Sequence, residues 1–139
     1  MTDSPVGLLA WIYEKLHDWT DDYPWTDDEI LTWISIYQFS RARPGASARI
    51  YYEALHSNKV EHEKAFSYIS NVKLDLAYFP KDIVVLPRLY GRTLGPVVLE
   101  SVHESGGHFG AWEKPQYIVN DLRKMFGKGG GAYRAVKGK

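Results

Sequence analysis

The sequence predicts an α/β protein whose first half is helical and whose second half contains two strands followed by a helix. Apolar residues recur every three to four positions up to about residue 39, which is the period of an amphipathic helix. Near residue 75 the period changes to two, as in a half-buried strand. A second apolar run, at 96–102, leads directly into a glycine-rich loop.

Three helices are predicted in the first half. An Asp-Ser-Pro sequence at 3–5 starts the first, which extends to about residue 18, because a capping side chain precedes a proline in the first turn. A Thr-Asp-Asp-Glu capping box at 26–29 starts the second, and Arg-Pro-Gly at 43–45 ends it. Ser47 is the N-cap candidate for a third helix that reaches about residue 55.

The residue pattern of the second half predicts a strand at 72–78, a short helical turn at 81–85 and a second strand at 96–102. A tight loop at 103–108 follows, and a last helix begins at a proline and ends at a glycine, at 115–127. Two strands joined by such a crossover normally pair in parallel. Because two strands do not make a self-sufficient sheet, we expect part of the sheet to be missing from the chain.

Composition excludes several classes of function. The 139 residues have a formal net charge of zero, so no strong field favours nucleic acid or an anionic membrane as a partner. There is no cysteine, which excludes disulfides, thiolate nucleophiles and zinc–thiolate sites. No apolar run approaches the ~20 residues of a membrane span. A cytoplasmic location is therefore the expectation.

Two side chains follow the two predicted strands and are the candidates for chemistry. His108 lies in a Gly-Gly-His-Phe turn at 106–109, and Asp82 lies just after the first strand. Parallel strands deliver such residues to one sheet edge, where α/β folds bind ligands. Histidine suits a general base near neutral pH, and a carboxylate on its ring N–H fixes the tautomer. A loop histidine without a chemical role, and an aspartate that caps backbone donors, remain the alternatives.

Other possible sites fail on spacing or context. His103 and His108 are one residue too far apart for the two-histidine zinc helix, and glycines oppose a helix there. The Gly-Ala-Ser-Ala sequence at 45–48 follows a helix, whereas a serine elbow follows a strand. The glycines at 129–131 lack the spacing of a phosphate loop. We expect neither a metal nor a cofactor.

Four segments, taken in order, resemble the successive motifs of epoxide hydrolases, in particular the microsomal and fungal types. These segments are Asp3-Ser4-Pro5-Val6-Gly7-Leu8, Ser47-Ala48-Arg49-Ile50-Tyr51-Tyr52-Glu53, Phe79-Pro80-Lys81-Asp82-Ile83, and Gly106-Gly107-His108-Phe109 with Trp112-Glu113-Lys114-Pro115. Asp82 and His108 are 26 positions apart (108 − 82), which matches the family. The resemblance extends from Asp3 to about Phe126.

The resemblance implies a partial α/β-hydrolase fold: a helical lid followed by the last two parallel strands and the C-terminal helix of the core. Residues 1–70 would be the cap or lid, residues 71–127 the C-terminal part of the core, and residues 128–139 a flexible basic tail. The resemblance also implies hydrolysis of a small lipophilic epoxide to a vicinal diol. His108 would be the general base, Asp82 its orienting acid and Tyr51 a lid proton donor. Tyr52 is the neighbouring alternative, but on a helix it points about 100° away.

The family's nucleophile is an aspartate on a glycine-flanked turn, and no aspartate in this chain has that context. Those present are at positions 3, 18, 21, 22, 27, 28, 75, 82 and 121. We therefore expect the chain alone to be inactive, as a truncated enzyme would be. One alternative is a second polypeptide that supplies the N-terminal half. Another is a non-catalytic module that binds epoxides or diols. Asp75 stands where relatives often have glycine, which puts the backbone of that strand in question.

Overall fold

The computed structural model of the protein describes residues 3–58, 63–64 and 66–137. The chain divides into two compact units. Residues 1–18 and 22–64 form the first unit, and residues 19–21 and 65–139 form the second. The short segment 19–21 therefore has its contacts with the C-terminal half of the chain. The predicted domain boundaries and the flexibility of residues 128–139 stay predictions.

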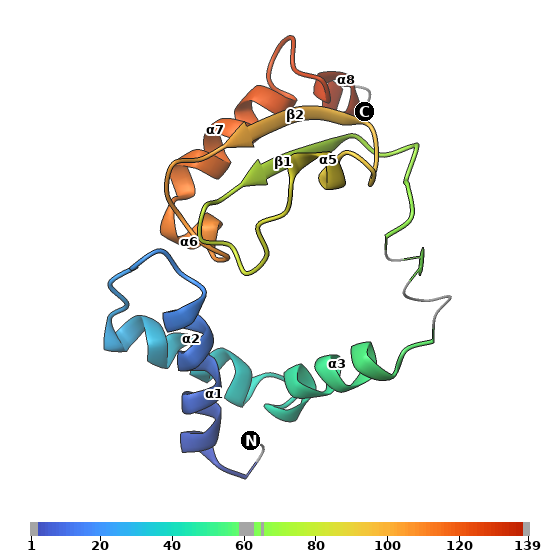
Figure 1. The fold of residues 1–139 in the computed structure, drawn as a ribbon. Helices are drawn as coiled ribbons and strands as arrows, with labels where there is room; N and C mark the ends of the chain where they lie inside the picture. Colours follow the sequence, from blue (N-terminus) through green and yellow to red (C-terminus); the bar gives the residue numbers. More distant parts are fainter. Residues whose placement is uncertain (1–2, 59–62, 65, 138–139) are drawn as a thin grey trace. The chain divides into compact units, whose positions relative to one another are not determined.

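The first unit contains the three predicted helices (Figure 1). They are α1 (Pro5–Asp18), α2 (Asp27–Phe39) and α3 (Gly45–His56). The capping box is confirmed: Thr26 accepts from the backbone N–H of Glu29, whose side chain accepts from the backbone N–H of Thr26. The second helix ends at Phe39, ahead of the predicted 43–45.

The prediction that Ser47 caps the third helix is wrong. Pro44 already has helical backbone angles (φ −57°, ψ −31°), and α3 begins directly after it. Ser47 lies within the helix, where its hydroxyl donates to the carbonyl oxygen of Pro44 at 3.1 Å. Because proline needs no partner for a backbone N–H, the helix starts there without a side-chain cap.

Helices α1 and α2 pack together and form the core of the first unit. Buried side chains recur on one face of each helix at spacings of four residues. They are Leu8, Ile12 and Leu16 on α1 and Ile30 and Ile34 on α2. A side chain outside the helices adds a hydrogen bond to this unit. The indole N–H of Trp25 donates to the carbonyl oxygen of Leu16 on α1 at 2.8 Å.

The second unit is built on the two predicted strands, β1 (Leu74–Tyr78) and β2 (Val97–Val102). They pair in parallel, as predicted, and their last residues, Tyr78 and Val102, are register partners. The longer helix α7 (Pro115–Phe126) packs on this sheet (Figure 1) and ends at Gly127, again as predicted. Three short helices complete the unit: α5 (Arg88–Gly91), α6 (Gly110–Glu113) and α8 (Tyr133–Lys137).

The predicted helical turn at 81–85 is wrong. Lys81 forms a parallel bridge with Gly107, and its N–H donates to the carbonyl oxygen of Gly106 at 3.1 Å. Lys81 is thus paired with another segment, and the residues that follow it, 82–87, form bends and irregular backbone without a helical turn. The short helix α5 forms later instead, directly after Pro87.

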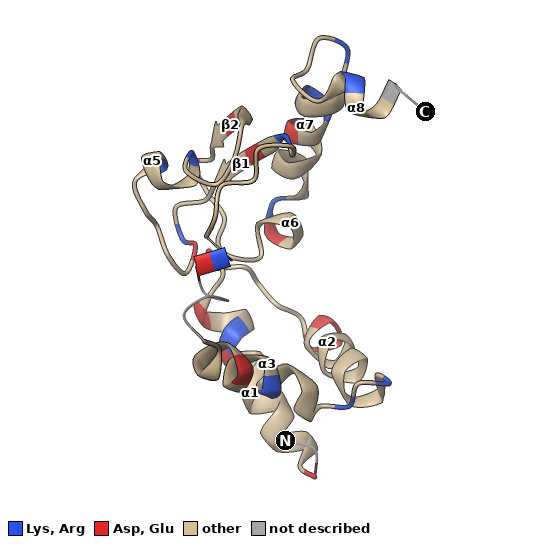
Figure 2. Ribbon diagram, turned by 90° about the vertical axis from the view of Figure 1, so that its right-hand side faces the viewer, with Lys and Arg blue, Asp and Glu red and all other residues tan. Residues whose placement is uncertain are grey.

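Acidic and basic residues are interspersed over both units, in keeping with the zero net charge (Figure 2). The most buried of these charged groups in the described parts is Asp121 on α7, which is 2% exposed. Its carboxylate accepts from the hydroxyl of Ser101 at 2.7 Å and bonds His103 Nε2 at 2.9 Å. The His103 ring is stacked between Phe79 and Tyr117. Helix α7 is thereby joined to the end of β2 through polar bonds in a buried setting.

Asp75 on β1 lies near this cluster. Partial burial raises the pKa of Asp75 above its ordinary value, and the negative charge of Asp121 raises it further, whereas His103 and Lys124 act in the opposite direction. At pH values between the ordinary pKa and the raised one, the folded state therefore holds a proton that the unfolded state releases. Asp75 consequently favours folding most below its ordinary pKa, and this contribution is lost as pH rises through the raised value.

We predict that Asp75→Asn makes the protein more stable at neutral pH, because an amide has no charge to desolvate. The gain over wild type should shrink as the pH falls to about 3. Urea unfolding at several pH values measures this difference. Glu104→Gln, at an exposed position, is the matched control and should leave the pH profile unchanged. A gain for Asp75→Asn that does not vary with pH would contradict the prediction.

Candidate active site

The two candidate residues of the second unit lie together at the carboxyl edge of the sheet. Asp82 follows β1 and His108 follows β2, and the two strands are parallel neighbours. His108 Nδ1 is 2.9 Å from Asp82 Oδ1. The backbone contact of Lys81 with Gly106 and Gly107 joins the two loops directly beside this pair. The structure therefore brings together two side chains that are 26 positions apart in the sequence.

The hydrogen bond has a consequence for the imidazole. A carboxylate can only accept, so a neutral His108 carries its proton on Nδ1, and Nε2 keeps its lone pair. The same carboxylate oxygen also accepts from the backbone N–H of Ile83 at 2.7 Å, which holds Asp82 in place. Both side chains are about two-fifths exposed, with 43% for His108 and 39% for Asp82. Nε2 is therefore the nitrogen that a water molecule could approach as a proton donor.

Aromatic rings and a backbone bond orient His108. Trp19 meets the imidazole edge-on, with ring centroids 5.4 Å apart, and Phe109 does so at the same distance. The carbonyl oxygen of Trp19 also accepts from the backbone N–H of His108 at 2.8 Å. The imidazole is thus constrained by its backbone, by its neighbours and by Asp82.

The preceding glycines are required by the turn. Gly106 has φ +108°, in the region that favours glycine, and a Cβ there would lie 2.7 Å from the Phe79 ring. A Cβ on Gly107 would lie 2.6 Å from the carbonyl oxygen of Trp19. The N–H of Gly106 donates to Asp21 Oδ2 at 2.8 Å, and that of Gly107 to Glu113 Oε1 at 3.1 Å.

A half-open apolar pocket of about 530 Å³ lies beside Asp82. Its volume is within the usual range for small-molecule sites. The pocket is lined by the end of β1 and by the segment that leads through α5. Its apolar lining residues include Phe66, Phe79, Val84, Leu86, Tyr90 and Leu94. Tyr78 also lines the pocket, and the pKa of its hydroxyl is raised by partial burial and by the negative charge of Glu100.

Tyr51 lies on α3, in the first unit. Its ring is half exposed and meets Trp11 edge-on, with centroids 5.9 Å apart. The neighbouring Tyr52 stacks instead on His56 at 4.0 Å, one turn further along the helix. The two tyrosines thus have different partners, as the helical rotation between adjacent residues requires.

Three residues of this site were missed by sequence reasoning: Trp19, Asp21 and Glu113. Asp21 was considered only as a nucleophile. Glu113 stood within a motif that carried the resemblance, but it was given no role. Burial would have been the signal for Glu113, because a glutamate that is 8% exposed needs donors for its oxygens. Burial, however, is a property of the folded chain.

No group of three or more histidine, cysteine or acidic side chains with metal-binding geometry occurs in the part of the chain that the structure describes. His103, a member of the rejected zinc motif, is bonded to Asp121. Among the described helices, none combines the length and the apolarity needed to cross a bilayer.

Comparisons with known proteins agree on one family. No protein-family model matches the sequence. A Stigmatella aurantiaca protein assigned as an epoxide hydrolase is 34% identical over 91% of this chain and 28% of its own length. The Aspergillus niger epoxide hydrolase is 32% identical, with a TM-score of 0.67 over 87% of this chain and 29% of that structure. The Bombyx mori juvenile hormone epoxide hydrolase is 28% identical, with a TM-score of 0.77 over 98% of this chain and 34% of that structure.

These similarities confirm two predictions. The resemblance to epoxide hydrolases is confirmed in sequence and in structure, and the fold is part of an α/β-hydrolase fold. The chain spans about a third or less of the length of these relatives.

Proposed function

We propose that this chain, which matches part of the epoxide hydrolases in sequence and in fold, carries the water-activating residues of an epoxide hydrolase site. The observation that carries this proposal is the 2.9 Å hydrogen bond between Asp82 and His108 at the carboxyl ends of adjacent parallel strands. The substrate would be a lipophilic epoxide and the product a vicinal diol. No aspartate of these 139 residues has the context of the nucleophile, so that group would come from additional polypeptide.

The reaction would proceed in two steps. The nucleophilic carboxylate attacks one oxirane carbon, the C–O bond breaks, and Tyr51 donates a proton to the resulting alkoxide oxygen. His108 Nε2 then takes a proton from water as that water attacks the ester carbonyl. Asp82 stabilises the imidazolium that forms. The acyl C–O bond of the ester then breaks, the second proton of the water passes to the departing alkoxide, and the diol leaves with the carboxylate of the nucleophile regenerated. The proton on His108 returns through solvent to Tyr51, which the first step left as a phenolate.

Two features support a lipophilic substrate. The pocket beside Asp82 is walled mainly by apolar and aromatic side chains. Asp82 is its one carboxylate among the described lining residues, which places a polar group at one side of an apolar space. Such a combination suits a small apolar molecule with a single reactive centre.

A chimera tests this function. This chain would replace the matching 29% of the Aspergillus niger epoxide hydrolase, and the product would be incubated with styrene oxide. We expect diol formation by the chimera and none by this chain alone. The control for the chain alone is His108→Ala, which should give the same background. Diol formation by the isolated chain above that control would contradict the need for a nucleophile from additional polypeptide.

A second candidate is one half of a split hydrolase. A continuous apolar stretch, Ile83 to Leu86, is about half exposed or more at each residue, and Leu89 and Tyr90 on α5 are also exposed. Exposed apolar surface of this kind marks interaction sites. Co-expression with the remaining part of the Aspergillus niger protein should then yield an active complex. Failure of the two polypeptides to associate counts against this candidate.

A ligand-binding module would instead bind the diol product with an affinity unaffected by Asp82→Ala.

A further inference from the structure

We propose that Asp21 and Glu113 are positioning residues that hold the His108 turn through its backbone. The inference rests on the function proposed above only for its catalytic consequence. The relevant observation is that three consecutive backbone N–H groups, those of Gly106, Gly107 and His108, each have an acceptor outside the turn. The acceptor of Gly107 is six positions away, whereas those of Gly106 and His108 lie in the distant segment 19–21.

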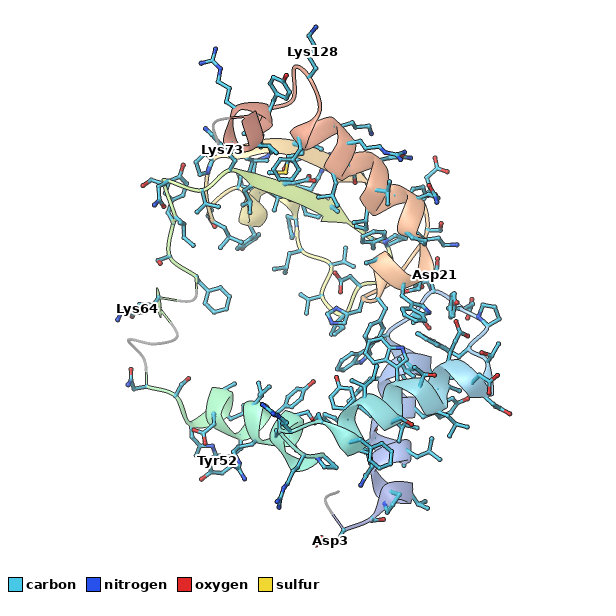
Figure 3. All side chains as sticks on the ribbon, turned by 180° about the vertical axis from the view of Figure 1, so that it is seen from behind. Asp3, Asp21, Tyr52, Lys64, Lys73 and Lys128 are labelled. Carbon is cyan, nitrogen blue, oxygen red and sulfur yellow. The ribbon has the colours of Figure 1, made fainter. Side chains whose placement is uncertain are left out.

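The acceptors form one connected group. Asp21 Oδ2 accepts from Gly106 at 2.8 Å, and Glu113 Oε1 accepts from Gly107 at 3.1 Å. The second oxygen of Glu113 accepts from the backbone N–H of Asp21 at 2.7 Å, so the two acids are themselves linked. Figure 3 shows the Asp21 side chain beside the α6 segment that carries Glu113. We call Asp21 and Glu113 the carboxylate cradle.

Because the groups that form these hydrogen bonds are largely buried, the bonds contribute to the stability of the turn. Gly106 and Gly107 are buried, and Glu113 is 8% exposed. A buried N–H without an acceptor destabilises the folded state, and carboxylate acceptors make hydrogen bonds about twice as strong as neutral ones. Gly107 leaves room for Glu113, because a Cβ on Gly107 would lie only 3.1 Å from Glu113 Oε1. The two glycines and the two acids are therefore parts of one arrangement.

The cradle acts on His108 through the chain. It fixes the two residues immediately before His108, while Asp82 holds the ring from the other side. A shift of about 1 Å in the turn would lengthen the bond between Nδ1 and Asp82 and move Nε2 away from its water. The carboxylates of Asp21 and Glu113 bond backbone N–H groups, so their effect on His108 is on the position of the imidazole.

The two acids should respond differently to amidation. Asp21 uses one carboxylate oxygen for the turn, so Asp21→Asn can keep the bond with its carbonyl oxygen. Glu113 uses both oxygens as acceptors, so Glu113→Gln must turn an NH2 group toward one backbone N–H. We therefore expect Asp21→Asn to be tolerated, whereas Asp21→Ala and Glu113→Gln loosen the turn.

Nuclear magnetic resonance of the full chain tests this without any substrate. The tautomer of His108 is measured from its ring nitrogens in wild type and in the three variants, and His108→Ala assigns the signals. Wild type and Asp21→Asn should show the proton on Nδ1. Asp21→Ala and Glu113→Gln should show a mixture of tautomers. Glu104→Gln, an exposed acid of the same loop, is the matched control and should resemble wild type.

Amide exchange in the wild-type chain provides a second measurement that no folding defect can obscure. The amides of Gly106, Gly107 and His108 should exchange at least ~10-fold more slowly than unprotected loop amides. Unprotected amides at Gly106 and Gly107 would overturn the inference, as would an unchanged His108 tautomer in folded Asp21→Ala and Glu113→Gln. Neither measurement depends on turnover. A chimera without activity would therefore contradict the proposed function without contradicting the proposed role of Asp21 and Glu113.

Discussion

Replacing His108 with alanine should lower steady-state diol formation by the chimera about 10²–10⁴-fold, which is the usual contribution of a positioned general base. The physical reason is that only the second step needs this base. Ring opening by the nucleophilic aspartate continues without it, and the resulting ester then accumulates. Rapid mixing with styrene oxide, followed by mass spectrometry of the intact protein, should show one covalent adduct per molecule.

The matched control is His17→Ala, since His17 is an exposed histidine on α1 whose partner is the adjacent Asp18. That variant should retain the turnover of the unmodified chimera and accumulate no adduct. Normal turnover by His108→Ala, or loss of turnover without an adduct, would show that water is activated by another group.

The second large effect is expected for Asp82→Asn, with turnover reduced by about 10³-fold. The amide cannot stabilise the imidazolium by charge. If its NH2 faces the ring, the His108 proton moves to Nε2, where it blocks the lone pair that should accept from water. The measurement is the same adduct assay, and the ester should again accumulate. Asp82→Glu, which retains a carboxylate, should recover part of the turnover.

The double variant sharpens this prediction. Because the acid acts only through the base, His108→Ala with Asp82→Asn should be no slower than His108→Ala alone. Asp22→Asn, in the first unit, serves as the control at an exposed aspartate. Additive losses in the double variant would mean that Asp82 acts independently of His108.

Local signals in the sequence predicted most of the secondary structure. The capping box at Thr26 and the proline and glycine that bound α7 are such signals, and they depend on a few adjacent residues. The parallel pairing followed from the crossover between β1 and β2. The prediction for Ser47 was wrong because Pro44, three residues earlier, is also a favourable helix start, and residue propensity alone does not decide between the two.

The pairing of Asp82 with His108 could be predicted because both follow strands that are neighbours in the sheet. The helical turn predicted at 81–85 is wrong because the backbone of Lys81 pairs with Gly107, a contact over 26 positions that local sequence signals do not report. The carboxylate cradle could not be predicted for a related reason. Asp21 and Gly106 are 85 positions apart, and no periodic pattern reports a hydrogen bond over that distance.

That distance also bears on the order in which the chain folds. Contacts across 85 to 92 residues cost more loop-closure entropy than local ones, so we expect them to form after the helices and after the pairing of the strands. The His108 turn would then be the last part of the second unit to become ordered and the first to open. A fragment that begins at Asp22 would keep both strands and α7, yet it would lack two of the three acceptors of the turn, those of Trp19 and Asp21. Order at this histidine thus depends on residues near the opposite end of the sequence.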